Sequence, residues 1–167
     1  MSDNPLTRLL GVEHPIVLAP FGGLSSVELT ATVSELGGLG SYGLYGYEPD
    51  RILETVAALR AATSRPFAVN LWLPTGDEVT PADGGLDATI AVVAPFFAEL
   101  GAPVPEPPAA YLPDFAAQAE AVLEARPAAL SFVFGVPPAG VVDAARERGI
   151  RIVGTATTVE EALALEA

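Results

Sequence analysis

The sequence predicts an α/β protein built on a parallel β-sheet, and three observations lead to that prediction. Short apolar runs alternate with segments of helical periodicity along the 167-residue chain. Capping-box spacing marks the expected start of several helices, and glycines mark where helices stop. Alternation of this kind implies parallel strands joined by right-handed crossovers. An open doubly wound sheet and a closed barrel both fit it, so the pattern alone leaves the closure open.

The first expected β/α unit starts at the apolar run "PIVLAP", Pro15–Pro20, which is typical of a strand buried on both faces. Ser25 and Glu28 have capping-box spacing, so a helix is expected to follow. Gly37 and Gly38 are expected to end that helix, because glycine is the usual residue just past a helix C-terminus.

The later units repeat the same pattern. Further strands are expected at Leu39–Tyr42, Pro66–Trp72, Ala129–Gly135 and Arg151–Thr155. Further helices are expected at Pro49–Ala62, Phe115–Ala125 and Gly140–Arg148. A last helix is expected after Thr157 or Thr158, because Glu160 and Glu161 each fall three residues after a threonine.

Residues 1–167 are expected to form a single domain. Its irregular part runs from residue 74 to residue 113 and is rich in Pro, Gly and Asp, although "LDATIAVVAPFFAEL" within it has a helical pattern. We interpret this segment as a long βα insertion after the third strand. In α/β folds such loops lie at the carboxyl ends of the strands, where ligands bind.

Composition limits the class of function. Hydrophobic residues make up 50% of the chain and charged residues 17%, which is a globular composition. The net charge of −13 argues against nucleic acid or an anionic membrane as the main partner. The absence of cysteine excludes disulfides, thiolate catalysis and cysteine-based metal sites. No apolar run has the length of a signal peptide core or a membrane helix, so a soluble, cytoplasmic protein is expected.

The ends of the expected strands carry glycines and one amide. Glycines let a flat ligand approach the backbone, and Asn70 offers both a hydrogen-bond acceptor and donors. Together they suggest a pocket for a planar, amide-like ring, although each residue alone is also an ordinary turn residue. Neither GxGxxG nor a GxxxxGK[ST] phosphate loop is present.

The titratable residues give little support for catalysis. His14 is the single histidine and lies before the first expected strand, on the face opposite an active site, so a structural or exposed role is expected. A histidine-rich metal site is therefore excluded. The carboxylates are expected on a solvated acidic surface, and the alternative for Asp77 and Glu78, just beyond the third expected strand, is that they reach the mouth of the pocket.

Four segments, in this order, resemble the nitronate monooxygenases, also called 2-nitropropane dioxygenases. They are "GVEHPIVLAPFGGLSSVELTATVSELGGLGSYG", "RPFAVNLWLP", "LSFVFGVPP" and "GTATTVEEAL". The resemblance covers essentially the whole chain and implies the first five units of an FMN-binding (β/α)8 TIM barrel. Flavin-type enoyl-acyl carrier protein reductases share much of the pattern, which leaves that activity as an alternative.

The resemblance also implies roles for particular residues. The segment expected to lie against the flavin ring is Ala19, Pro20, Phe21 and Gly22. Asn70 matches an asparagine near the flavin, and Thr155 matches a position that approaches the ring, where some members carry Lys. Tyr42 and Phe134 would line the substrate pocket. Trp72 points to the same side as Asn70 and is expected to fill the barrel core.

A complete barrel of this kind needs roughly 250 residues. The family's histidine motif on strand six, its proposed catalytic base, and its FMN phosphate loops near strands seven and eight have no counterpart in this sequence. No catalytic residue is therefore assigned. The resemblance implies FMN-dependent oxidation of alkyl nitronates, with weak or no activity expected from these residues alone. The alternative is a non-catalytic fragment or split-barrel module, completed by a second copy or by a partner chain.

Overall fold

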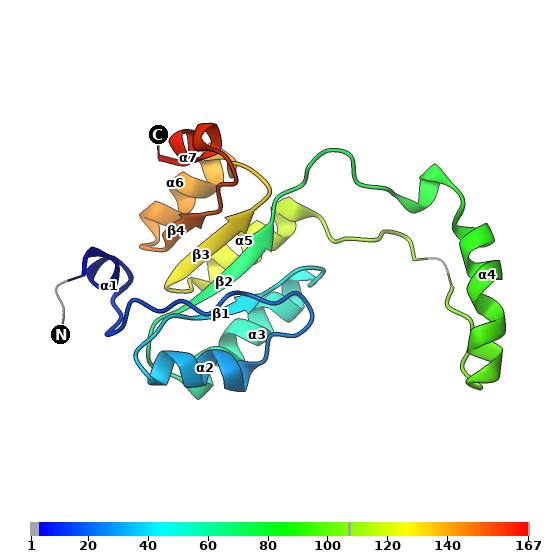
Figure 1. Cartoon of the computed structure of the whole chain (residues 1–167), viewed down its shortest axis with the longest axis horizontal. Coiled ribbons are helices and arrows are strands. Elements are labelled where there is room, and N and C mark those ends of the chain that lie inside the picture. The colour runs from blue at the N-terminus through cyan, green and yellow to red at the C-terminus, as the bar shows by residue number, and fades with distance from the viewer. Residues whose placement is uncertain (1–3, 107, 167) are drawn as a thin grey trace.

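The computed structural model describes residues 4–106 and 108–166 and contains a four-stranded parallel sheet. The strands lie in the order β1-β2-β3-β4, and every neighbouring pair is parallel (Figure 1). Their bounds are Gly40–Gly43 for β1, Phe67–Trp72 for β2, Ala129–Val133 for β3 and Arg151–Gly154 for β4. The predicted parallel α/β class is confirmed.

Helices precede and follow the strands as the sequence predicts. The bounds are α1 Pro5–Leu10, α2 Val27–Glu35, α3 Pro49–Ala62, α4 Leu86–Glu99, α5 Phe115–Ala125, α6 Ala139–Glu147 and α7 Val159–Glu166, with a 3-10 turn η1 at Pro81–Asp83. The bounds of α3 and α5 are those predicted from apolar periodicity and flanking residues.

The main hydrophobic core lies between the sheet and helices α3 and α5. Val69 and Phe132 extend from this face of the sheet, and Ile52 and Val122 meet them from the helices; all four are fully buried. Burying such side chains contributes about 1.5–3 kcal/mol each. This layer therefore holds the middle of the sheet rigid.

The opposite, inner face of the sheet carries small residues. The register aligns Gly43, Asn70, Ser131 and Val153 in one row across all four strands, because paired residues of a parallel sheet share a face. Leu10 of α1 packs near the amino ends of the strands, in a cluster with Ala68 and Ala129. Beyond this cluster the exposure of the inner face is uneven, since Asn70 is 3% exposed, Val153 38% and Trp72 39%.

The first expected strand is shorter and more exposed than its sequence suggests. Within Pro15–Pro20, only Val17 forms a bridge, to Leu39, with two backbone hydrogen bonds beside it. Ile16 is 60% exposed and Val17 49%, so the expectation of burial on both faces is wrong. The segment lies beside β1 at the edge of the sheet and has a pairing partner on one side.

Two helix caps refine the predictions. Ser26 caps α2 by accepting a hydrogen bond from the backbone N–H of Leu29, at 3.1 Å, so Ser25 is not the cap. At α7 the expected capping box is confirmed. Thr158 accepts from the N–H of Glu161, and the Glu161 carboxylate accepts from the N–H of Thr158.

The segment from residue 74 to residue 113 carries η1 and α4, which we call the arm. In Figure 1, α4 lies away from the sheet, at the end of two extended stretches. No described residue of α4 is buried, and its apolar side chains Val92 and Phe96 are 69% and 61% exposed. Among the described residues, no helix combines the length and the apolar character needed to cross a bilayer.

Candidate functional site

Asn70 lies on the inner face between Gly43 and Ser131, and its side-chain amide has a fixed orientation. Its Nδ2 donates to the backbone carbonyl of Ser131 at 3.2 Å and to the Ser131 hydroxyl at 2.9 Å. A carbonyl oxygen only accepts, so the amide nitrogen must face Ser131. The Ser131 hydroxyl is itself within 3.4 Å of the Val69 carbonyl, to which it donates. Oδ1 of Asn70 receives no hydrogen bond from any described residue and is left as an acceptor.

The loop after the first expected strand is tied to the end of β1. The Ser25 hydroxyl donates to the Phe21 carbonyl at 2.9 Å and accepts from the backbone N–H of Gly43 at 3.0 Å. A Cβ at Gly43 would come within 2.9 Å of the Phe21 carbonyl oxygen, so only glycine permits this approach. Because Gly43 is the register partner of Asn70, the Phe21–Gly22 loop lies one strand away from the Asn70 amide.

Three aromatic rings form a row across the carboxyl ends of the strands. The Tyr45 and Trp72 ring centroids are 3.9 Å apart, and Phe134 meets Trp72 edge-on at 5.1 Å. Trp72 lies on the same face of β2 as Asn70 and is 39% exposed. Phe134 has a φ of 71°, a left-handed conformation that costs energy in a non-glycine residue.

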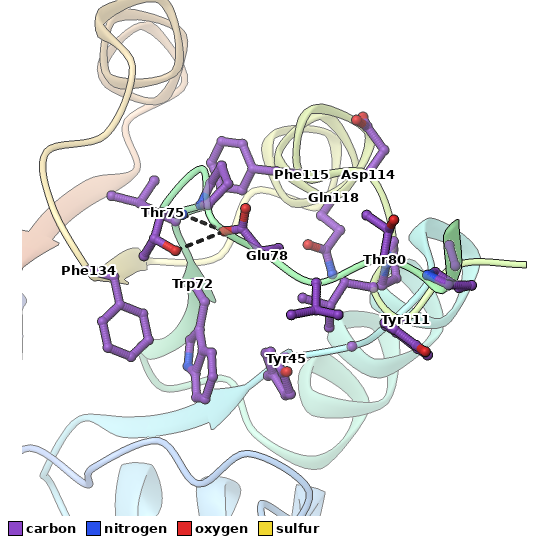
Figure 2. A pocket seen from close by; sticks show the side chains of 18 of the residues that line it. Tyr45, Trp72, Thr75, Glu78, Thr80, Tyr111, Asp114, Phe115, Gln118 and Phe134 are labelled. Carbon is purple, nitrogen blue, oxygen red and sulfur yellow. Dashed lines mark hydrogen bonds between the residues drawn. The ribbon is translucent and has the colours of Figure 1, made fainter. Parts of the chain in front are cut away.

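A cavity of about 680 Å³ lies beside this row and is shown in Figure 2. The aromatic row forms one wall, and the first turn of α5, at Phe115 and Gln118, forms another. The two ends of the arm close the remaining sides, with Thr75–Pro81 entering it and Ala109–Asp114 leaving it. Segments that are far apart in the sequence therefore share one cavity.

Glu78 is the carboxylate at the rim of the cavity. It accepts hydrogen bonds from the backbone N–H groups of Thr75 and Gly76 and from the Thr75 hydroxyl. These bonds, the backbone bond from Thr75 foremost, hold the pKa of the Glu78 carboxyl below its usual value, so it is ionised near neutral pH. The sequence predicts a solvated acidic surface here, with the pocket mouth as the alternative for Asp77 and Glu78, and Glu78 lines the cavity.

The structure brings together some of the predicted site residues and separates others. Phe21, Gly22 and Asn70 gather near the carboxyl end of the inner face, and Ala19 and Pro20 lead into that loop. Phe134 belongs to the aromatic row, and Thr155 is exposed just after β4.

Tyr42 lies on the other face of the sheet, among the helices. Its hydroxyl is 3.1 Å from that of Tyr47, and Arg51 stacks over the Tyr47 ring. Burial, with the Tyr47 hydroxyl, raises the pKa of Tyr42 to about 12. Tyr42 therefore does not share a cavity with Asn70.

Sequence reasoning missed several residues of this region. Ser131 and Ser25 are small hydroxyl residues in a strand and a turn, with nothing local to indicate their contacts across the sheet. Gln118 lies within the helical pattern of α5, and the pattern alone does not distinguish a buried glutamine from an exposed one. Tyr45 was detectable in part, since it lies three residues after the end of the expected strand Leu39–Tyr42.

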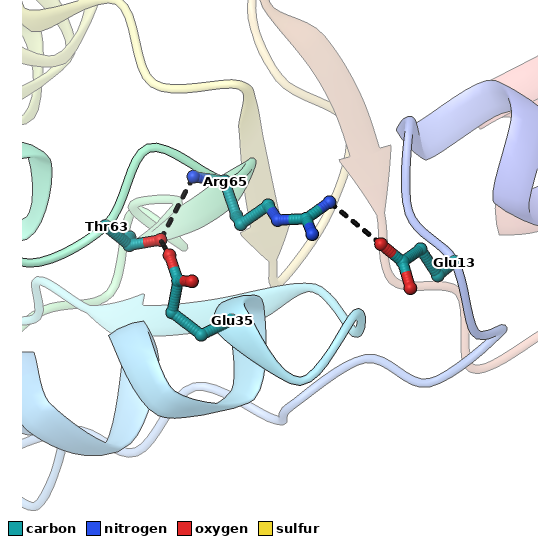
Figure 3. Close-up of polar contacts among 4 residues, drawn as sticks. All are labelled: Glu13, Glu35, Thr63 and Arg65. Carbon is teal, nitrogen blue, oxygen red and sulfur yellow. Dashed lines mark hydrogen bonds and ion pairs between the residues drawn. The ribbon is translucent and has the colours of Figure 1, made fainter.

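The amino edge of the sheet has a structural network, drawn in Figure 3. Arg65 forms an ion pair with Glu13 at 2.9 Å, and Thr63 donates to Glu35 while accepting from the Arg65 N–H. His14 is exposed beside Gly37 at this same edge, as expected. No cluster that could hold a metal ion occurs among the residues that the structure describes.

Comparisons with known proteins agree with this geometry. The family model described as "Nitronate monooxygenase" matches residues 3–167. A nitronate monooxygenase from Pseudomonas aeruginosa is 40% identical over 100% of this chain and 48% of its own length. A nitronate monooxygenase from Paraburkholderia phytofirmans is 34% identical over 97% of this chain and 44% of its own length.

Solved structures are also similar to this chain over nearly its whole length. A nitroalkane oxidase from Streptomyces ansochromogenes has a TM-score of 0.77 and 33% identity, over 96% of this chain and 45% of its own. FabK from Thermotoga maritima has a TM-score of 0.71 at 22% identity, over 99% of this chain and 41% of its own, which supports the fold alone. This chain spans about half the length of the curated relatives it matches. That share fits the N-terminal portion of a barrel, which by itself is incomplete.

Proposed function

The chain belongs to the nitronate monooxygenase family, and on that premise we propose that it takes part in FMN-dependent oxidation of alkyl nitronates. Its residues would contribute the binding surface for the flavin ring. The carboxyl half of the inner face, from the Phe21–Gly22 loop to Thr155, is the proposed surface.

The single observation that carries this proposal is the fixed amide of Asn70. Its nitrogen is held by Ser131, and its Oδ1 receives no hydrogen bond from any described residue. Asn70 is 3% exposed as a residue, but no fully buried side-chain oxygen among the described residues lacks a partner, so Oδ1 is accessible to a donor from outside the chain. The imide N–H of a flavin ring has the polarity that this oxygen requires.

The residues around Asn70 fit a flat ring. Gly43 has no side chain, and the Phe21–Gly22 loop, held by Ser25, is positioned to cover one side. FMN, when bound, would supply the redox chemistry. The row formed by Gly43, Asn70, Ser131 and Val153 contains no group that titrates near neutral pH, so the contribution of these residues is binding and orientation.

An FMN titration of the chain, followed through tryptophan fluorescence, tests the proposal. Trp72 is the single tryptophan, and it lies two residues from Asn70 on the same side of β2, roughly 7 Å along the strand. Saturable quenching is expected after correction for flavin absorbance. Asn70→Leu should weaken the affinity about tenfold, as expected for one lost hydrogen bond to a buried acceptor.

Glu120→Gln is the matched control, since Glu120 is exposed on α5, which packs against the opposite face of the sheet, and this variant should bind like the wild type. Quenching that rises linearly with FMN and does not saturate would contradict the proposal. Equal affinity of the Asn70→Leu variant would remove Asn70 from the site. Turnover of a nitronate with FMN present, compared with oxidation of reduced nicotinamide, would separate the family activity from that of the reductase alternative.

A further inference from the structure

The cavity beside the aromatic row contains a second buried amide, Gln118 on α5. Its Nε2 donates to the backbone carbonyl of Tyr47 at 2.8 Å, and the residue is 7% exposed. Because the Tyr47 carbonyl can only accept, the nitrogen must face it and Oε1 must point the other way. Figure 2 shows the Gln118 side chain reaching into the cavity.

Oε1 of Gln118 receives no hydrogen bond from any residue that the structure describes. The amide cannot rotate to pair this oxygen without leaving the Tyr47 carbonyl unpaired. Gln118 is thus an acceptor of fixed orientation on a side chain that is only 7% exposed, and its free oxygen is accessible from the cavity that it lines. A ligand that enters the cavity and brings a donor to this point gains a hydrogen bond there.

The charge around the cavity restricts the ligand further. Its carboxylates are Glu78 and Asp114, and among its described lining residues there is no Arg, Lys or His. Glu78 is ionised because its hydrogen bonds to Thr75 and Gly76 stabilise the carboxylate. An anionic group would therefore be repelled here, whereas a neutral donor or a cation would be accepted.

The walls favour a flat ring. Tyr45, Trp72, Tyr111 and Phe134 come from four separate segments, and each is between 38% and 57% exposed. Exposed aromatic faces that converge on one cavity offer stacking surfaces, and stacked or edge-to-face rings attract each other beyond the effect of their buried area. The volume of about 680 Å³ lies within the range of small-molecule sites.

We propose that this cavity binds a neutral or cationic aromatic compound through an O–H or N–H group that donates to Oε1 of Gln118. The site is distinct from the Asn70 surface, because Asn70 does not line the cavity. The inference does not depend on FMN, and it assigns Gln118 as the residue that selects ligands with a donor.

The test compares aromatic probes that differ in the donor, with the whole chain and without FMN. The probe with a donor is p-cresol, which has a phenolic O–H. Toluene, which is smaller than p-cresol, and 4-methylanisole, which is larger, both lack an O–H donor. Dissociation constants come from NMR titration of the Gln118 side-chain amide and from Trp72 fluorescence. The wild type should bind p-cresol about tenfold more tightly than either control, the usual worth of one hydrogen bond to a buried acceptor. The anion 4-methylbenzoate should bind more weakly than p-cresol.

Gln118→Met keeps the length of the side chain and removes the acceptor. The variant should therefore bind p-cresol and the two probes without a donor with about equal dissociation constants. Glu120→Gln is the matched control, because Glu120 is exposed on the same helix and does not line the cavity, so this variant should keep the preference. Circular dichroism checks that both variants fold. If Gln118→Met does not fold, the wild-type preference and the shift of the Gln118 amide decide the matter.

Equal binding of p-cresol and the two controls by the wild type would overturn the proposal. So would a preference that survives in Gln118→Met, because Gln118 would then not be the acceptor. Absence of binding by every probe up to millimolar concentration would show that the cavity is not an aromatic site. A positive result with p-cresol would stand even if FMN failed to bind.

Discussion

The sheet with helices α3 and α5 buries its aromatic side chains, whereas the arm leaves similar side chains exposed. Phe132 in β3 is fully buried against α5, where Phe115 lies 6.5 Å from it between ring centroids. Phe96 in α4 is 61% exposed. Both residues lie in apolar segments with regular backbones, so hydrophobic composition alone does not decide burial. Burial follows from neighbouring elements, which α4 lacks among the described residues.

The largest expected effect comes from the tightest contact beside the sheet. A Cβ on Gly40 would lie 2.0 Å from the Thr30 carbonyl oxygen and 2.7 Å from the Ser34 hydroxyl. Backbone must therefore move, and Gly40→Ala should lower the free energy of unfolding by more than about 3 kcal/mol. Urea denaturation measures this. Gly140→Ala in α6 meets nothing within 4 Å and should cost nothing, or add up to about 1 kcal/mol.

A pair of phenylalanine truncations tests the contrast directly. Phe132→Ala should cost about 3–5 kcal/mol, because it leaves a cavity in the core. Phe96→Ala should change stability by less than about 0.5 kcal/mol, since the ring is exposed. Thermal or urea unfolding of the two variants decides it. A cost above about 2 kcal/mol for Phe96→Ala would mean that the arm is packed against something in solution.

The junction between arm and sheet should show an intermediate effect. Asp114 caps α5 by accepting from the backbone N–H of Ala117 at 2.9 Å. Asp114→Ala should destabilise the chain by about 1 kcal/mol, whereas Asp114→Asn keeps the acceptor and should cost less. Hydrogen exchange in the first turn of α5 provides the local readout. Equal exchange in both variants would show that this cap does not hold the junction.

The smallest effect is a pH dependence at an exposed helix start. Hydrogen bonds from the backbone and then the hydroxyl of Thr157, with the Thr158 backbone, lower the pKa of Glu161 from its usual value. The stabilisation is present above the ordinary glutamate pKa and is lost as pH falls through the lowered one. NMR titration of the carboxyl carbon should show that lowered pKa. Thr157→Ala should bring it back towards the ordinary value, and an unchanged pKa would contradict this explanation.

Local signals in the sequence were sufficient for much of the fold. Apolar periodicity predicted α3 and α5 with their observed bounds, and the threonine–glutamate spacing predicted the cap of α7. The apolar run Pro15–Pro20 misled, because its sequence cannot show how many strands will pair with it. The inner face needed contacts between distant segments, such as Asn70 with Ser131, which are 61 residues apart. Tyr42 was placed in the pocket from the resemblance, although it alternates with Gly43 and so faces the helices.

The way the arm joins the sheet has a practical consequence for engineering. Its entering and leaving stretches both line the same cavity, and its glycine pair Gly84–Gly85 is open to solvent. A chain break at that pair would cut no hydrogen bond between strands, because β2 and β3 pair in register from Ala68 with Ala129 to Trp72 with Val133. The two halves are therefore expected to reassemble from separate polypeptides. If each half were fused to one of two interacting proteins, binding between those proteins would bring the halves together. The reassembled cavity would then be detected through its binding of an aromatic probe.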